Sequence, residues 1–182
     1  MKLAGQGRMV LGLALALVLQ LAVPLGAERR RDPLTPVEID QLRDAMVDPD
    51  QRLKLYVTFS RDRMTKLEQM RSDPKTKERA RQTHDMLEDF LAVYDELNDN
   101  IDMYVGRKDD IRKPLKVVIE ADTEFESKLR AIKNTVNDNA TEISQYEFLL
   151  TDALDTVDSS ADDHRKTVLE VEEYVKKKKK TK

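Results

Sequence analysis

The chain contains no cysteine and no tryptophan among its 182 residues. Without cysteine it can form no disulfide, it has no thiol nucleophile, and it lacks the residue that carries the lipid of a bacterial lipoprotein. Glycine is nearly as scarce, because only Gly106 lies beyond residue 27. A single glycine excludes the glycine-rich loops that bind nucleotides, and no Gly-x-Ser-x-Gly elbow is present. These absences predict a protein that is not an enzyme and uses no cofactor, with a mechanism based on carboxylates alone as the enzymatic alternative left open.

The first 27 residues have the pattern of a cleaved export signal. Lys2 and Arg8 supply positive charge, residues 9–23 are almost wholly apolar, and Ala27 offers a small residue just before the charged Glu28. A retained membrane anchor is the alternative, but the apolar run is shorter than the roughly 20 residues that a spanning helix needs. We therefore predict a signal peptide over 1–27 and a periplasmic or secreted mature protein. The absence of disulfides favours a bacterial periplasm.

The rest of the chain predicts an all-α fold. Glu, Asp, Lys, Arg, Leu and Ala dominate it, and the β-branched runs that mark strands are missing. We expect a charged, disordered arm over 28–34, a helical bundle domain over 35–175, and a basic, disordered tail over 176–182. Long helices whose apolar residues recur every three or four positions pack at shallow angles. The bundle should therefore be elongated and antiparallel, with heptad-like seams.

Capping residues and breaks divide this domain into five expected helices. Thr35 to Glu38 form a capping box, with proline in the first turn, and Asp48-Pro49 repeats the signal for a second helix. The third helix should end at Gly106, since glycine enters the left-handed conformation without strain. Asp109 or Asp110 should cap the fourth helix. The predicted helices cover about 36–48, 49–72, 74–106, 110–136 and 140–175, with a break at 137–139 and the last helix continuous across 158–160.

The segment 82–106 carries acidic residues but no lysine or arginine. Its apolar positions follow one helix face, and its back is lined by Asp85, Glu88, Asp89, Asp95, Glu96, Asp99 and Asp102. We treat these seven carboxylates as a candidate interaction site. The simplest expectation is pairing with cations of the fourth helix, such as Lys113, Lys116, Lys128, Arg130 and Lys133. The alternative is divalent-cation binding, although the EF-hand-like set Asn98, Asn100, Asp102 and Asp109 has Met103 where glycine is required.

Five polar residues fall within the predicted seams: His84, Asn98, Asp122, Ser160 and His164. They could form a buried metal or catalytic site, or they could set the register of the helices. Di-iron bundles place a carboxylate three residues before each histidine, but positions 81 and 161 are Arg and Ala. The two histidines should also lie about 20 Å apart along the bundle. The pattern therefore favours histidines at the edge of the bundle or register-setting polar residues, and it predicts no metal site.

Charge is strongly segregated along the chain. The net charge of −3 becomes −5 once Lys2 and Arg8 are removed with the signal, and the body without Lys176–180 and Lys182 stands at −11. Two interpretations of Lys176, Lys177, Lys178, Lys179 and Lys180 stay open: a solvated tail that aids solubility, or a segment that engages an anionic membrane or envelope surface. No aromatic residues alternate with these lysines, so specific nucleic-acid binding is not expected. A protein partner of unknown identity and a homo-oligomer remain open.

The first predicted helix resembles a known family. Leu34-Thr35-Pro36-Val37-Glu38, followed by Gln41-Leu42-Arg43, resembles the Leu-Thr-x-x-Gln motif of Spy-type periplasmic helical chaperones, with Glu38 in place of Gln. The resemblance covers this helix alone and implies a periplasmic helical binding protein. The expected function is that of an exported, non-enzymatic bundle, adaptor-like or chaperone-like. The alternative is a carboxylate-rich, divalent-cation-binding envelope protein.

Overall fold

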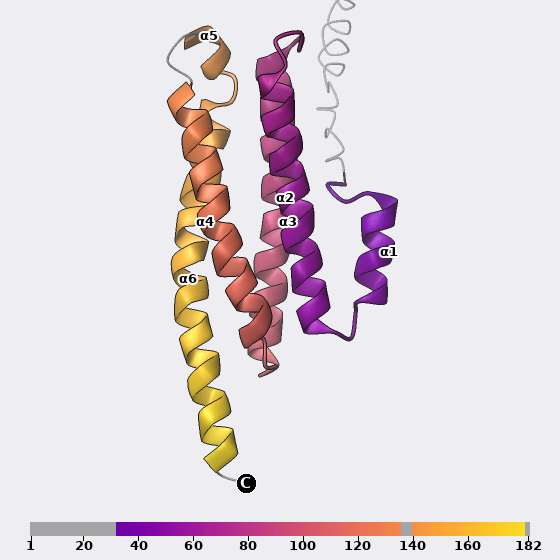
Figure 1. The fold of residues 1–182 in the computed structure, drawn as a ribbon, viewed down its shortest axis with the longest axis vertical. Coiled ribbons are helices and arrows are strands. Elements are labelled where there is room, and N and C mark those ends of the chain that lie inside the picture. Colours follow the sequence, from indigo (N-terminus) through magenta and orange to yellow (C-terminus); the bar gives the residue numbers. More distant parts are fainter. Residues whose placement is uncertain (1–31, 136–139, 181–182) are drawn as a thin grey trace, which may run out of the picture. The chain divides into compact units, whose positions relative to one another are not determined.

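The computed structural model describes residues 32–135 and 140–180, and every regular element in these ranges is a helix. Figure 1 shows α1 (Pro36–Asp44), α2 (Pro49–Ser72), α3 (Arg79–Gly106), α4 (Arg112–Asn134), α5 (Ala140–Ile143) and α6 (Glu147–Lys180). The all-α prediction is confirmed. The predicted signal peptide, positions 28–31 of the arm and the break at 137–139 lie outside the described residues. Within the described ranges, no helix is both long and apolar enough to cross a membrane.

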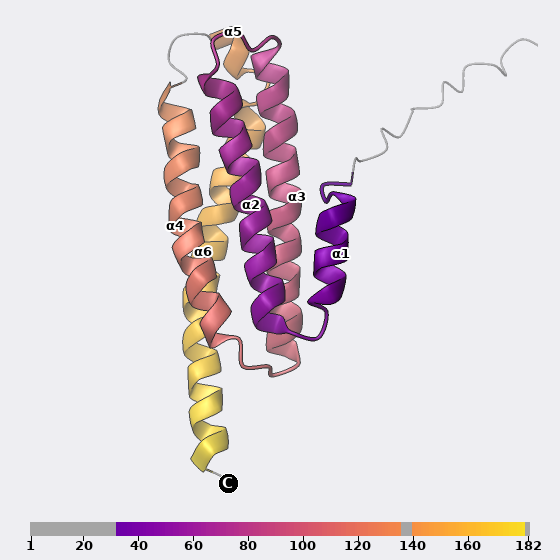
Figure 2. The ribbon, with the colours of Figure 1, turned by 45° about the vertical axis from the view of Figure 1, so that its right-hand side comes forward.

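Four helices enclose the hydrophobic core. α2 packs against α3 and α4, and α6 packs against the same two helices, so α3 and α4 face each other across the core. The short α1 lies outside this ring and packs on α2, as Figures 1 and 2 show from two sides. Helices that follow one another in sequence are therefore not always neighbours in space.

The segment 82–106 forms the part of α3 that fills the core. Its predicted apolar face is buried from Leu87 to Tyr104, and only Val105 at its end is half-exposed. The densest contact is an aromatic cluster. The ring of Phe125 on α4 meets the rings of Phe90 and Tyr94 edge-on, with centroids 5.3 and 6.0 Å apart. Because α3 and α4 lie diagonally opposite, these long side chains bridge the centre of the bundle.

The first two helices begin where the sequence predicts. Thr35 accepts a hydrogen bond from the Glu38 backbone N–H while the Glu38 carboxylate accepts one from Thr35, which completes the capping box. Asp48 accepts a hydrogen bond from Gln51 N at 3.1 Å, and Pro49 occupies the first turn of α2. α1, however, ends at Asp44 rather than near Asp48, so Met46 lies beyond the helix and is 65 % exposed.

The turn between α2 and α3 is longer than predicted. The Thr76 hydroxyl donates a hydrogen bond to the Met70 carbonyl, which closes the end of α2, and Glu78 adopts a left-handed conformation before α3 begins at Arg79. The end of α3 lies at Gly106 as expected, but the left-handed residue is Lys108, with φ of 62°. Asp109 N bonds to Tyr104 O and Lys108 N to Val105 O, the pattern of a Schellman motif.

The later helices also differ in their ends. The residue before the first turn of α4 is Ile111, whose side chain is fully buried, rather than Asp109 or Asp110, but Asp110 does accept a hydrogen bond from the Arg112 backbone N–H at 3.5 Å. The expected final helix divides into α5 and α6 around Tyr146. That side chain is buried, and its hydroxyl accepts a hydrogen bond from Arg71 at 3.1 Å. The helix does continue without interruption across 158–160, as predicted.

The predicted disorder at both ends of the domain is corrected where the chain is described. Leu34 packs against the core, and Pro33 O accepts a hydrogen bond from Arg63, so the end of the arm is attached. The lysines predicted as a disordered tail continue α6 as far as Lys180. Glu172 and Glu173 lie 3.7 and 3.6 Å from Lys176 and Lys177, and cations at a helix C-terminus are favoured by its dipole.

A buried ion pair attaches α1 to α2. Both oxygens of Glu38 contact the Arg63 guanidinium, with the Oε2–Nη2 distance at 2.7 Å, and both side chains are about nine-tenths buried. Arg52 of α2 donates to the Leu42 carbonyl at 2.6 Å and to Asn100 of α3 at 2.9 Å. Arg52 therefore joins α1, α2 and α3.

This ion pair predicts a defined loss of stability in acid. Burial tends to raise the pKa of Glu38, but hydrogen bonds from Arg63 and Thr35 outweigh it and lower the pKa from 4.5 to about 2. A carboxyl group whose folded pKa is depressed stabilises the protein above its unfolded pKa, and this stability is lost as the pH falls toward 2. The contribution is about 3 kcal/mol. Urea unfolding measures the difference in the free energy of unfolding between the wild type and Glu38→Gln. We expect this difference to decrease by about this amount between pH 7 and pH 2. A gap that does not change with pH would contradict the assignment.

Candidate functional site

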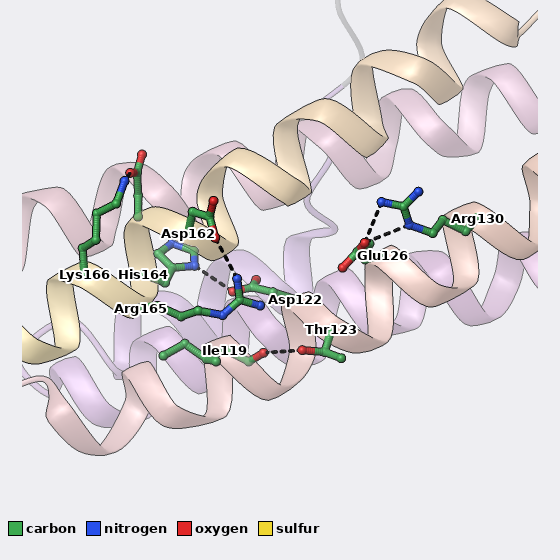
Figure 3. A network of polar contacts seen from close by, with 10 residues as sticks. Ile119, Asp122, Thr123, Glu126, Arg130, Asp162, His164, Arg165 and Lys166 are labelled. Carbon is green, nitrogen blue, oxygen red and sulfur yellow. Dashed lines mark hydrogen bonds and ion pairs between the residues drawn. The ribbon is translucent and has the colours of Figure 1, made fainter.

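A buried polar cluster joins three helices near the centre of the bundle. We use the term polar core cluster for Tyr94 on α3, Asp122 on α4 and His164 on α6. The Tyr94 hydroxyl donates to Asp122 Oδ1 at 2.7 Å, and His164 Nδ1 lies 2.9 Å from Asp122 Oδ2. Figure 3 shows His164 directed toward Asp122, with Asp162, Arg165 and Lys166 on neighbouring turns of α6. Tyr94 and Asp122 are completely buried, and His164 is 4 % exposed.

The hydrogen bonds of this cluster offset the free-energy cost of burying the Asp122 carboxylate. A buried carboxylate needs partners for both of its oxygens, and Asp122 has one for each. Burial raises the pKa of Tyr94, and the nearby Asp122 carboxylate raises it further, so the phenol remains a hydrogen-bond donor. The arrangement fits the register-setting interpretation, because each bond crosses between helices.

Of the other polar seam residues, Ser160 also reaches the Tyr94 hydroxyl of this cluster. Asn98 donates a hydrogen bond to Ser160 at 3.0 Å and so links α3 to α6. His84 has a side chain that is 45 % exposed and lies 3.5 Å from its neighbour Asp85. Three members of the EF-hand-like set, Asn98, Asn100 and Asp102, lie within the continuous helix α3, where Asn100 accepts a hydrogen bond from Arg52, and Asp109 lies beyond the end of that helix. Among the described residues, no group of three or more His, Asp or Glu side chains is placed to hold a metal ion.

The seven acidic residues of α3 do not all share one environment. Glu88, Asp95, Glu96, Asp99 and Asp102 are exposed, whereas Asp85 and Asp89 are half-buried. Asp85 lies 4.0 Å from Arg81, one turn earlier on the same helix. Asp85, Glu88, Asp95, Asp99 and Asp102 follow one another at intervals of three, four or seven residues, so they lie on one side of α3. We call these five residues the acidic face.

The expected pairing of this face with α4 is wrong because of the order of the helices. α3 and α4 lie across the core from each other, so their outer surfaces point in opposite directions. Lys128 instead lies 2.7 Å from Glu68 of α2, and Arg130 lies 2.7 Å from Glu126 on its own helix. Two of the cations named from the sequence, Lys128 and Arg130, therefore pair with acidic residues of α2 and α4.

The helix order also separates charge between two sides of the bundle. α3 has seven acidic and two basic residues, and its neighbour α6 has nine acidic and two basic residues before Lys176. The other adjacent pair is basic, since α2 and α4 each carry six basic residues against three and four acidic ones. One side of the bundle is thus strongly acidic and the other is mildly basic.

The five lysines of α6 form the most concentrated positive charge. With 34 residues, α6 is about 51 Å long, compared with about 35 Å for the 23 residues of α4. Its last turns extend beyond the ends of the other helices in Figure 1. Lys176–Lys180 are all exposed and follow one another at about 100° around the helix. We call this ring of charge the lysine tip.

The base of the lysine tip is held against the connection between α3 and α4. The Tyr174 ring lies between Lys108 and Lys178, whose Nζ atoms are 5.9 and 5.8 Å from its centroid. The pKa of Asp110 is lowered mainly by its hydrogen bond to Arg112, with a smaller contribution from Lys179. These contacts connect the base of the lysine tip to the segment between α3 and α4.

Sequence reasoning missed several of the residues that organise these sites. Tyr94 was assigned only to the apolar face of α3, although its hydroxyl completes the polar core cluster. The sequence does not single out Arg52 or Arg63, because they bind Leu42 and Glu38 of α1, and the residue spacing within α2 does not show where α1 lies. The chain matches no protein-family model, and neither the curated proteins nor the solved structures give a significant match. The fold and the site therefore define the class, an all-α helical bundle with segregated surface charge.

Proposed function

We propose that the protein is an exported, non-enzymatic helical bundle that binds an anionic surface through the lysine tip and presents its acidic face to a protein partner. The observation that carries this proposal is the extension of α6 beyond the bundle, with all five lysines exposed on an ordered helix. Export, to the periplasm or outside the cell, is supported by the signal-like pattern of residues 1–27. The partner of the acidic face would carry positive charge.

The chemistry of the tip favours binding at a surface rather than insertion into it. The lysines surround the helix, so no side of these turns is apolar, and the last apolar residue is Val175. A polybasic segment near an anionic membrane gains about 1 kcal/mol per lysine. The acidic side formed by α3 and α6 would be repelled by the same surface, which leaves the acidic face accessible to a partner.

The proposed bundle is elongated and antiparallel, with heptad-like seams. Support comes from the short connections at 45–48, 73–78 and 107–111, since short loops join antiparallel helices. The core positions of α4 support the seam pattern, with buried side chains at Leu115, Val118, Asp122, Phe125, Leu129 and Ile132.

Cosedimentation with lipid vesicles tests the surface-binding proposal. Vesicles containing anionic lipid should retain the protein at low salt, and neutral vesicles should not. Replacing Lys177, Lys178, Lys179 and Lys180 with Gln should weaken binding by about 4 kcal/mol, or about a thousandfold. Raising the salt concentration should release the wild type, because exposed charges are screened.

A matched variant separates the tip from net charge. Lys66, Lys113, Lys116 and Lys133 are exposed on α2 and α4, and replacing these four with Gln removes the same charge from the body. This variant should bind vesicles nearly as well as the wild type. Equal losses in the two variants would show that net charge alone governs binding. Unchanged binding in the tip variant would refute the proposal and leave the carboxylate-rich cation binder as the alternative to pursue.

A further inference from the structure

We infer that α1 is an exchangeable segment and that two copies of this chain associate by trading α1 between them. The partner surface is thus the α1-binding face of α2 in a second copy. This inference does not depend on the surface binding proposed above, because it involves the opposite end of the chain from the lysine tip.

The first support is that the residues that bind α1 belong to other helices, so the binding face does not depend on which copy supplies α1. Arg63 and Arg52 both belong to α2, and they hold the Glu38 carboxylate and the Leu42 carbonyl, respectively. Asn100 of α3 fixes the guanidinium of Arg52 by accepting from its Nε at 2.9 Å. Every one of these contacts could be made equally by the α1 of another copy, since none involves the linker.

The second support is the position of α1 relative to the core. It lies outside the four-helix ring and packs on α2, whereas each of the four long helices packs against two others of the ring. A helix of nine residues is too short to be stable alone in water, so α1 needs a binding face wherever it is. Exchange preserves the same face and the same bonds, which makes it a low-cost route to a dimer.

The third support lies in the linker, which runs from Ala45 to Asp48. Asp48 is extended, with φ of −112° and ψ of 98°, and it precedes Pro49, which disfavours a helical conformation at Asp48. Met46 and Val47 are apolar but 65 % and 86 % exposed. Short hinges favour domain swapping. When two linkers open and cross at a twofold axis, each Met46-Val47 pair would lie beside its counterpart and be shielded from water.

Charge reversal provides a test that only exchange can satisfy. Glu38→Arg places two arginines at the buried contact, and Arg63→Glu places two glutamates there, so neither variant can form the ion pair within its own chain or in a homodimer. When the two variants are mixed, exchange restores both pairs. The α1 of the first variant meets Glu at position 63, and the α1 of the second variant meets the native Arg63.

Size-exclusion chromatography with light scattering, performed on the full chains, is the readout. Each variant alone should be monomeric, and the equimolar mixture should yield a species of twice the molar mass. The double variant Glu38→Arg with Arg63→Glu restores the pair within one chain, and far-UV circular dichroism of this variant shows whether the reversed pair folds. If that control folds and the mixture remains monomeric, the inference is overturned.

A second variant keeps the test decisive if either single variant aggregates. Deleting Met46 and Val47 shortens the linker so that α1 cannot turn back onto its own α2, while both members of the ion pair remain. This shortened chain should be a dimer. In the otherwise wild-type chain, insertion of Gly-Ser-Gly-Ser after Val47 should shift the population toward monomer. A monomeric shortened chain would overturn the inference.

Discussion

Replacing His164 with leucine is expected to lower the free energy of unfolding by about 3–5 kcal/mol. The substitution leaves the Asp122 carboxylate completely buried with the Tyr94 hydroxyl as its single remaining partner in the polar core cluster. Leucine cannot hydrogen-bond, and water does not reach Asp122 to replace the imidazole. Urea unfolding followed by circular dichroism measures the change.

His84 supplies the matched control, because it is the other histidine of the chain and its side chain is 45 % exposed. His84→Leu should change the free energy of unfolding by no more than about 0.5 kcal/mol. A triple variant with Tyr94→Phe, Asp122→Leu and His164→Leu removes every polar group of the cluster. It should be more stable than His164→Leu alone, since apolar replacement of a buried pair is often nearly neutral. A loss below about 1 kcal/mol for His164→Leu would contradict the buried hydrogen bond.

Replacing Phe125 with alanine is expected to destabilise the bundle by about 3–5 kcal/mol. The Phe125 ring is fully buried and meets both Phe90 and Tyr94 edge-on across the centre of the core. Its removal leaves a cavity that α3 and α4 cannot close, because α2 and α6 lie between them on either side. Aromatic contacts beyond simple burial add to the loss.

Phe148 tests whether burial, rather than aromatic character, decides the size of this effect. It is 85 % exposed at the start of α6, so Phe148→Ala removes the same atoms from the surface. We expect this variant to change the free energy of unfolding by about 0.5 kcal/mol or less. Similar losses for the two variants would show that Phe125 does not occupy the centre of the core.

Local chemistry explains why much of the fold could be predicted. The Thr35 and Asp48 caps and Pro49 act through neighbouring backbone groups, so the starts of α1 and α2 follow from a few adjacent residues. The spacing of Leu87, Phe90 and Tyr94 similarly gives the buried face of α3. The end of α1 and the division between α5 and α6 could not be predicted, because they depend on contacts with residues distant in sequence, such as that of Tyr146 with Arg71.

In the candidate sites, too, the local features could be predicted from the sequence and the long-range contacts could not. The acidic residues of α3 and the lysines of α6 were found from the sequence, because a run of like charge is a property of composition. Their surroundings were not. The cations of α4 were expected beside the acidic face, but Lys128 lies against Glu68 of α2 instead. Tyr94 was not recognised as a polar partner because its spacing is that of a core residue, which it also is.

The sequence by itself determined that this protein is helical, where two of its helices begin, which face of α3 is buried and which residues carry its charge. Each of these properties depends on neighbours within a few positions along the chain. The tertiary structure decided that α3 lies beside α6 rather than α4, and that decision gathers the acidic residues on one side and joins Tyr94, Asp122 and His164 in the core. The physical reason is that heptad spacing fixes which side of a helix is buried but leaves open which helix will cover it.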